Sequence, residues 1–302
     1  KRAYKTRRKI IMDDLILNEA MEFFKASAAN DDIGAENRMA FAAAVKPIIN
    51  EFVAEKSLAR RIFFVDTNPG NGTASYSVDS GAREAFYLPR IGAVPTRVAV
   101  EGEIFVPGFD IADMAGWHIS HAKMGRLGTA KLELTKLKNA FVRKENEAAI
   151  ALIDGAVTPA NTVSNTDKSL TKSLLNLAVA ELDGREGYNA KVILVNSKRA
   201  GDMRLWGANE IDPKTMREGL EKAGGLGSIW GIDIIQHPRI GLNEFFVIDT
   251  DRAGIMPIYE DVQIQENPGA IKQLRVEYIG WEIIGMAIAD PLAIVKGTIA
   301  TS

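Results

Sequence analysis

The stretch Thr129–Asp154, which reads TAKLELTKLKNAFVRKENEAAIALID, is the one around which the rest of the chain is organised. Its apolar residues recur at the spacing of one face of an α-helix: Leu134, Leu137, Phe141, Ala148 and Leu152. Thr129 can cap the start and Gly155 can end it, so the pattern predicts one uninterrupted helix of 26 residues. Such a helix is roughly 39 Å long, longer than most globular helices. We interpret it as the spine of a flat, elongated subunit. Periodicity alone also fits an ordinary bundle helix, and the flanking segments decide between the two.

The overall composition is that of an ordinary soluble globular chain. Its 302 residues are 46% hydrophobic with a formal net charge of -2, which allows one large or two medium domains and gives no overall field that would attract nucleic acid. The absence of cysteine excludes disulfides and thiolate metal sites. The longest apolar runs, such as Ile283–Ala289, are far shorter than the ~20 residues that span a bilayer. We therefore expect a chain that is neither secreted nor membrane-bound.

The amino-terminal segment is basic. Six cations fall in the first nine residues: Lys1, Arg2, Lys5, Arg7, Arg8 and Lys9. Two readings fit this pattern, a solvated disordered arm and an arm that contacts phosphate or the acidic surface of a neighbouring subunit. Two helical stretches follow, over Asp13–Ala28 and Ala35–Ala59, and Pro47 can kink the second.

A β-rich segment separates these helices from the spine. Ile62–Val65 reads as a short strand closed by the turn cluster Asn68–Gly72. From Ser75 to Ile119, glycines and prolines recur between alternating segments such as Thr96–Glu101, which read as strands. An arm of this length without a core of its own is unusual inside a compact domain. We therefore expect another subunit to stabilise it.

Beyond the spine, Val157–Asn165 is a Thr/Asn/Pro-rich linker and the clearest internal boundary. The chain then alternates between helical and strand patterns, which predicts a compact α/β domain with a central sheet. The expected helices are Leu170–Leu182, Ser197–Leu205 and Pro213–Ala223, and the expected strands are Lys191–Val195, Ile232–Gln236 and Phe245–Asp249. Lys272–Ile288 is β-rich and is expected to pair beside the spine.

Signatures of catalysis are poor. Asn68–Thr73 and Gly224–Gly231 contain glycines but match neither a phosphate loop nor a dinucleotide-binding turn. His118 and His121 could share a helical face and hold a metal, yet no third ligand is indicated, so a structural role is favoured. Glu260 and Asp261, adjacent after an apolar strand, point to opposite faces and are interpreted as a solvated turn.

Three further polar or aromatic residues could line a cleft, although core packing and turn capping also explain them: Trp230, Asp249 and Asp251. We predict no enzyme activity, no cofactor and no metal.

The order of these elements resembles the major capsid protein of tailed bacteriophages, the HK-ninety-seven fold that encapsulins share. The closest likeness of sequence lies in the carboxyl-terminal third, in the segments Gly227–Gly231, Asn243–Asp249, Gly254–Asp261, Leu274–Tyr278, Ile284–Ala287 and Pro291–Gly297. The resemblance covers nearly the whole chain in order of elements, and its motifs are structural rather than catalytic.

The resemblance implies an α+β fold with named parts. We expect an amino-terminal arm at 1–34, a first part of the peripheral domain at 35–74, an extended loop at 75–122 and the spine helix at 123–158. An α/β axial domain at 159–270 and returning peripheral strands at 271–302 complete it. Leu134, Leu137, Phe141, Ala148 and Leu152 would then face the strands of Leu274–Ile288, and the charged face of Lys131, Lys138 and Glu145 would look toward the shell surface or a neighbour.

The resemblance also implies a function. It is that of a structural protein that self-assembles into pentamers and hexamers of an icosahedral shell around viral double-stranded DNA. Portal, scaffolding and decoration proteins are the expected partners, with non-specific contact to packaged DNA. The expected location is the virion capsid, assembled in the host cytoplasm. The basic arm would lie inside the shell or at a subunit junction.

One departure from the family concerns covalent cross-links. Some members join an extended-loop lysine to a peripheral-domain asparagine, but no lysine occurs between Lys56 and Lys123 and no asparagine follows Asn267. We therefore predict a non-covalent shell, in which β pairing, apolar contacts and charge pairs of the extended loop hold neighbours together. The charged residues expected to take part are Arg83, Glu84, Arg90, Arg97, Glu101 and Glu103. Two alternatives stay open, an encapsulin-like compartment for protein cargo and a soluble α/β enzyme with an inserted β arm.

Overall fold

The computed structural model describes residues 32–70, 73–78, 102–124, 126–206 and 227–300. Several expected features lie outside these residues: the basic arm, the helix Asp13–Ala28, the strand Thr96–Glu101 and the helix Pro213–Ala223. None of the helices in the described part of the chain combines the length and the hydropathy needed to cross a bilayer.

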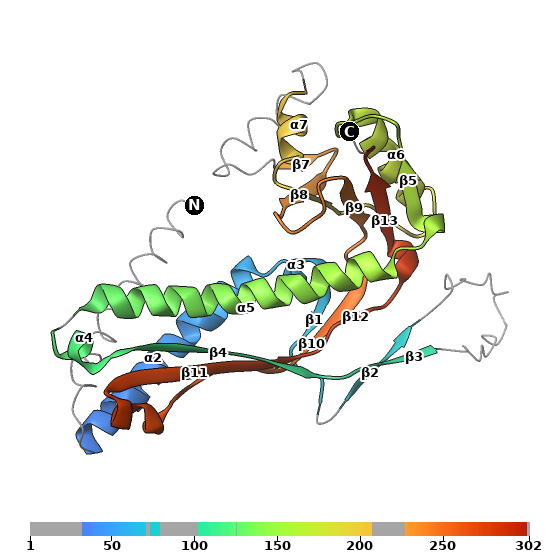
Figure 1. The fold of residues 1–302 in the computed structure, drawn as a ribbon. Coiled ribbons are helices and arrows are strands. Elements are labelled where there is room, and N and C mark those ends of the chain that lie inside the picture. The colour runs from blue at the N-terminus through green and yellow to red at the C-terminus, as the bar shows by residue number, and fades with distance from the viewer. Residues whose placement is uncertain (1–31, 71–72, 79–101, 125, 207–226, 301–302) are drawn as a thin grey trace, which may run out of the picture.

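The spine is helix α5, Leu127–Ala156, which runs through the middle of the molecule (Figure 1). The expected helix is confirmed, and at 30 residues it is longer than predicted at both ends. Arg126 rather than Thr129 occupies the N-cap, and Gly155 lies inside the helix instead of ending it. Tertiary packing explains the extension at the carboxyl end, because Ala156 and Val157 still pack against the main hydrophobic cluster.

A long sheet lies along the spine. Its strands run in the order β1 (Phe64–Asp66), β10 (Gly254–Glu266), β11 (Arg275–Ile284) and β4 (Phe109–His118), with β12 (Ala287–Ile288) also paired to β10. The β1–β10 pair is parallel and the other pairs are antiparallel. Helix α2 (Asp32–Lys56) packs on the same face as α5, since the ring of Phe41 meets those of Trp117 and Tyr278. Short helices α3 (Ala59–Ile62) and α4 (Ile119–Lys123) connect these elements.

Strand β4 differs from its expected place in the extended loop. It pairs with β11 along its whole length, and Ile111, Ala115 and Trp117 are buried in the main cluster. The part that projects is an antiparallel ribbon of β2 (Ala74–Val78) and β3 (Gly102–Val106), which leaves the sheet near β10 (Figure 1). The expected strand Ile62–Val65 also shifts, because Ile62 closes α3 and β1 begins at Phe64.

The second sheet has six strands in the order β5 (Thr162–Ser164), β13 (Ile294–Thr298), β9 (Glu244–Ile248), β6 (Val192–Val195), β8 (Ile232–Gln236) and β7 (Ser228–Ile229). Helix α6 (Lys172–Asp183) covers one face and buries Leu174, Leu175 and Leu182, while Thr171 caps its start. Helix α7 (Ala200–Arg204) and three 3-10 turns, at Pro159–Asn161, Pro268–Gln273 and Pro291–Ala293, complete the described elements.

The two sheets exchange strands at places that the sequence did not indicate. Strand β10, expected in the axial domain, lies in the sheet of the spine, and β13, expected beside the spine, lies in the axial sheet. A hydrophobic strand pattern shows that a strand is buried but not which sheet buries it, so these boundaries required the tertiary structure. One cluster joins the spine, its sheet and one face of the axial sheet, and a second joins the other face to α6.

Candidate assembly surfaces

The root of the β2–β3 ribbon is held by one tyrosine. The hydroxyl of Tyr259, in β10, accepts a hydrogen bond from the Ala74 backbone N–H at 2.8 Å and donates one to the carbonyl oxygen of Val106. Ala74 and Val106 are opposite each other at the base of the ribbon. A single side chain therefore ties both ribbon strands to the long sheet.

A second tyrosine ties the ribbon to β1. The hydroxyl of Tyr76, in β2, donates to Oδ2 of Asp66 at 2.7 Å. Burial and this bond to Asp66 raise the pKa of Tyr76, so the phenol remains a donor at physiological pH. Close packing adds to these bonds, because a Cβ at Gly285 would lie 2.8 Å from Cγ1 of Val106. The ribbon thus leaves the sheet in a defined direction.

The ribbon and its surroundings expose large apolar side chains. Phe105 in β3 is 62% exposed, and Phe64 in β1 is 60% exposed. An isolated two-stranded ribbon is marginally stable in water, and an exposed aromatic on it gains free energy when a partner covers it. Among the six charged residues expected to contact a neighbour, only Glu103 lies in the described part of the chain, where it is exposed on β3.

The face of the long sheet that points away from α5 is a second candidate surface. Met114 and Ile279 are opposite each other across β4 and β11, and they are 49% and 38% exposed. The opposite face carries the spine contacts. Leu137 and Phe141 are buried, Leu134, Ala148 and Leu152 are partly buried in the same cluster, and Gly280 of β11 lies close to Phe141.

Glu145 was expected on the charged, outward face of the spine, and this expectation is wrong. Its side chain is fully buried and meets the guanidinium of Arg60, from α3, at 2.8 Å. Glu282 of β11, also fully buried, lies 3.2 Å from Arg60, and the half-exposed Asp261 of β10 lies 3.4 Å away. Helical periodicity identified the position of Glu145 but not the arginine, which a distant segment brings to it.

The pair Glu260 and Asp261 is correspondingly not a solvated turn. Both residues lie inside β10, where the register with β11 shifts on either side of Glu260. Glu260 accepts a hydrogen bond from Nε1 of Trp281 at 3.3 Å, and Asp261 reaches Arg60. The irregular pairing lets these adjacent carboxylates serve two different partners.

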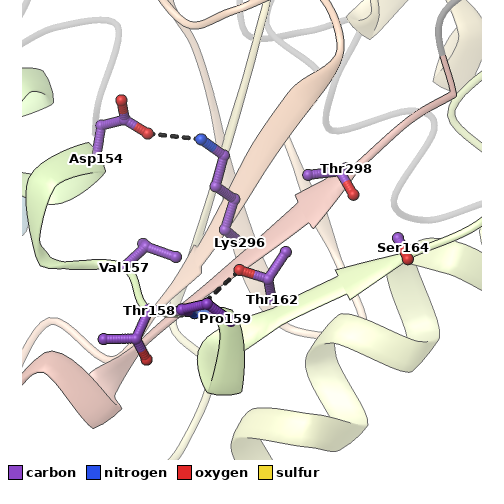
Figure 2. Close-up of a pocket in the computed structure, with 8 residues that line it drawn as sticks. All are labelled: Asp154, Val157, Thr158, Pro159, Thr162, Ser164, Lys296 and Thr298. Atoms are coloured by element: carbon purple, nitrogen blue, oxygen red, sulfur yellow. Dashed lines mark hydrogen bonds and ion pairs between the residues drawn. The ribbon is translucent and has the colours of Figure 1, made fainter.

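The end of the spine is joined to the axial sheet through Lys296. Its ammonium lies 2.6 Å from Oδ1 of Asp154, in α5, and 2.5 Å from Oε2 of Glu244, in β9. Figure 2 shows the contact between Lys296 and Asp154 at the edge of an open cavity. The cavity has a volume of about 560 Å³ and is also lined by Val157, Thr158, Pro159, Thr162, Ser164 and Thr298. Two carboxylates already pair with Lys296, so the cavity offers no uncompensated charge to an anionic ligand.

Two more contacts join the middle of the spine to the axial part. Arg239 pairs with Glu147 at 3.0 Å, and the Asn146 side chain lies 3.5 Å from Nε2 of His237. Asn146 also accepts from the Leu58 N–H at 2.7 Å. These bonds accompany a continuous apolar core, so the two parts form one firmly packed body.

The remaining candidate residues have local roles. Nδ1 of His118 accepts from the Ser120 N–H and caps α4, and the described residues contain no cluster of three or more potential metal ligands. Asp249 is buried and accepts from the N–H groups of Asn189 and Asp251, while Asp251 pairs with Lys191. Trp230 lines a polar cavity of about 400 Å³ beside Asp183 and Lys191, at a tight turn where its φ is 54°.

Comparison with known proteins gives these surfaces a context. The family model described as phage capsid protein matches residues 132–297, from the spine to the last axial strand. That match spans more than half of the 302 residues. The chain belongs to the phage capsid protein family.

Solved structures agree with this membership at the level of the fold. The capsid chain of an empty GTA particle superimposes on this chain with a TM-score of 0.58 at 15% identity, covering 82% of this chain and 90% of that one. A solved structure of Microbacterium phage Oxtober96 gives a TM-score of 0.56 at 16% identity, with 82% of this chain and 91% of that one covered. The encapsulin SrpI of Synechococcus elongatus gives 0.51 at 10% identity, with 80% and 86% covered. Comparison with curated protein sequences gave no significant match.

The capsid protein is therefore a structural shell protein with an HK-ninety-seven-type α+β fold. The anchored ribbon and the exposed face of the long sheet are the two candidate assembly surfaces that the described residues define. The charged and polar side chains described above form ion pairs and turn caps that hold the helices and strands to one another.

Proposed function

We propose that this capsid protein assembles into pentamers and hexamers that close an icosahedral shell around double-stranded DNA. The observation that carries the proposal is the β2–β3 ribbon, which Tyr259 and Tyr76 anchor at its root and which exposes Phe105. Repeated contacts of ordinary size around each closed ring give avidity even when each contact is modest. Family membership and the named capsid particles with the same fold support self-association.

The shell is held together without covalent cross-links in this proposal. The reason is chemical: the segment between Lys56 and Lys123 has no lysine amine to form an isopeptide bond, and no asparagine follows Asn267. The charge pairs of Arg83, Glu84, Arg90, Arg97, Glu101 and Glu103 would contribute to the loop contacts instead. The cations of Lys1–Lys9 would meet packaged DNA or a neighbour's acidic surface, with a strong dependence on salt.

The partners and location follow from the same proposal. Portal and scaffolding proteins, and a decoration protein in some capsids, would join the shell, which assembles in the host cytoplasm and becomes the virion capsid. A protein-cargo compartment is the second candidate, because an encapsulin shares the fold at a TM-score of 0.51. The contents of the particle distinguish the two.

Negative-stain microscopy of the purified full chain tests assembly, and closed icosahedral particles are expected. Absence of closed particles under all assembly conditions would refute the shell proposal. Nuclease-protected DNA inside particles from infected cells is expected, whereas particles filled with protein would favour the compartment. Denaturing electrophoresis of intact particles should give one band near the monomer mass of 32.9 kDa, and a ladder of multimers would exclude a non-covalent shell.

A further inference from the structure

Three carboxylates from three elements meet one guanidinium beneath the spine. Arg60 in α3 contacts Glu145 in α5 at 2.8 Å, Glu282 in β11 at 3.2 Å and Asp261 in β10 at 3.4 Å. Arg60 is 6% exposed and both glutamates are fully buried, whereas the Asp261 side chain is 44% exposed. Strand β4, which pairs with β11, adds no charge to the cluster, because the residue opposite Glu282 is Ile111. The cluster is therefore the polar link between the spine and the sheet.

The charges do not balance if every group is ionised. One guanidinium can neutralise one buried carboxylate, and water can solvate Asp261, so the second buried carboxylate is left uncompensated. Two adjacent buried carboxylates avoid this cost when one of them holds a proton.

The contacts of Glu282 indicate that this residue is the one to hold the proton. Oε2 of Glu282 meets Arg60, but no N–H or O–H group of the described residues reaches the buried Oε1 of Glu282. Glu145 and Glu282 are adjacent, because Oε1 of Glu145 and Oε2 of Glu282 both contact Nη2 of Arg60, at 2.8 and 3.2 Å. A proton on the unpartnered Oε1 makes Glu282 neutral and removes the repulsion between the two carboxyl groups, whereas two ionised carboxylates can only accept hydrogen bonds.

We propose that Glu282 holds a proton and, with Glu145 and Arg60, forms a proton-dependent latch that fastens the spine helix to the long sheet. The spine side of the latch is an ionised carboxylate bound to Arg60, and the sheet side is a neutral carboxylic acid. Loss of the proton to solvent leaves two buried carboxylates on one guanidinium, and their repulsion pushes the spine and the sheet apart.

The direction of the pH dependence follows from the proton count. Burial, and next the charge of Glu145, raise the pKa of Glu282 to about 9, against an opposing effect of Arg60. The unfolded chain loses this proton near pH 4 to 5, as an ordinary glutamate does. Between these two values the folded state holds one more proton, so its stability falls as the pH rises, by up to tenfold in the folding equilibrium constant per pH unit. The loss is complete above the folded pKa.

The latch belongs to the single subunit, and its effect on shells rests on the proposed shell function. The test therefore uses the full chain in whichever state it purifies, as particles or as free subunits. Unfolding by denaturant is measured from pH 5 to pH 9 for the wild type, Glu282→Gln and the control Asp261→Asn. Wild type and D261N should lose stability across this range, whereas E282Q, which keeps a neutral donor at all pH values, should be nearly flat.

Infrared spectroscopy supplies a readout that a merely structural role would not move. The absorption of a protonated carboxyl group should be present in the wild type at pH 7, disappear on titration toward pH 10 and be absent from E282Q. If E282Q does not fold, Glu145→Gln should also remove that absorption. The loss of the absorption on titration of the wild type toward pH 10 tests the latch without any variant. Equal pH slopes for wild type and E282Q, or no protonated carboxyl at pH 7, would overturn the latch. Failure to form particles would instead count against the shell.

Discussion

The ring of Phe245 occupies the space that a side chain at position 297 would need. The two residues are opposite each other across β9 and β13, and a Cβ at Gly297 would lie 2.0 Å from Cζ of Phe245, which is fully buried. Because the core around Phe245 is closely packed, a side chain at position 297 would displace either the ring or the strand.

Gly297→Ala should therefore destabilise the subunit, by about 1–3 kcal/mol, because overpacking displaces Phe245 or the strand. Denaturant unfolding measures the loss. The matched control is Gly155→Ala, in α5, where an added Cβ meets nothing within 4 Å. That change should raise stability by up to ~1 kcal/mol, since alanine is the better helix former. Equal effects of the two substitutions would mean that Phe245 and Gly297 are not in contact.

Tyr259→Phe should weaken assembly more than it weakens the subunit. The change removes the hydroxyl that bonds both ribbon strands, so the ribbon should lose its fixed direction while the subunit loses only about 1–2 kcal/mol. The control is Tyr188→Phe, which removes a comparable bond to Asp290 at the axial end. The yield of closed particles by sizing chromatography is the measurement, and equal yields for the two variants would contradict the role of the ribbon root.

Arg60→Met should cost far more than Lys296→Met. Removing Arg60 leaves the two fully buried glutamates with no counter-charge for the ionised one, at a loss of about 3–5 kcal/mol. Removing Lys296 frees Asp154, whose side chain is 51% exposed, and the half-buried Glu244, so the loss should stay near ~1 kcal/mol. Unfolding free energies of the two variants at pH 7 decide this, and similar losses would show that burial does not set the cost.

Ala140→Pro should abolish particles. A proline in the middle of α5 removes a backbone hydrogen bond and clashes with the preceding turn, at a cost of ~3 kcal/mol or more in each subunit. Ala140→Ser at the same position keeps the helix and serves as the control. Normal shells from the proline variant, seen by negative-stain microscopy, would mean that the spine does not hold the subunit in shape.

Much of the architecture could be predicted from local pattern. The spine, α6 and the strands β6 and β8 fall within a few residues of the expected segments, because each has a clear apolar period or a capping residue. Cap residues were less informative, since α5 extends past both Thr129 and Gly155. The candidate surfaces were foreseen only in outline: a projecting β arm was expected, but Tyr259 and Tyr76, which hold it, carry no local signal.

The sequence by itself determined the spine, α6 and the strands β6 and β8, and that the spine joins a β arm to an α/β unit, because periodicity and turn residues act within one segment. Only the tertiary structure decided which sheet takes β4, β10 and β13, and that Glu145 is buried. The physical reason is distance along the chain. Arg60 and Glu145 are 85 residues apart, and Arg60 and Glu282 are 222 apart. No local pattern encodes a charge balance that forms only when the packed core brings such residues together.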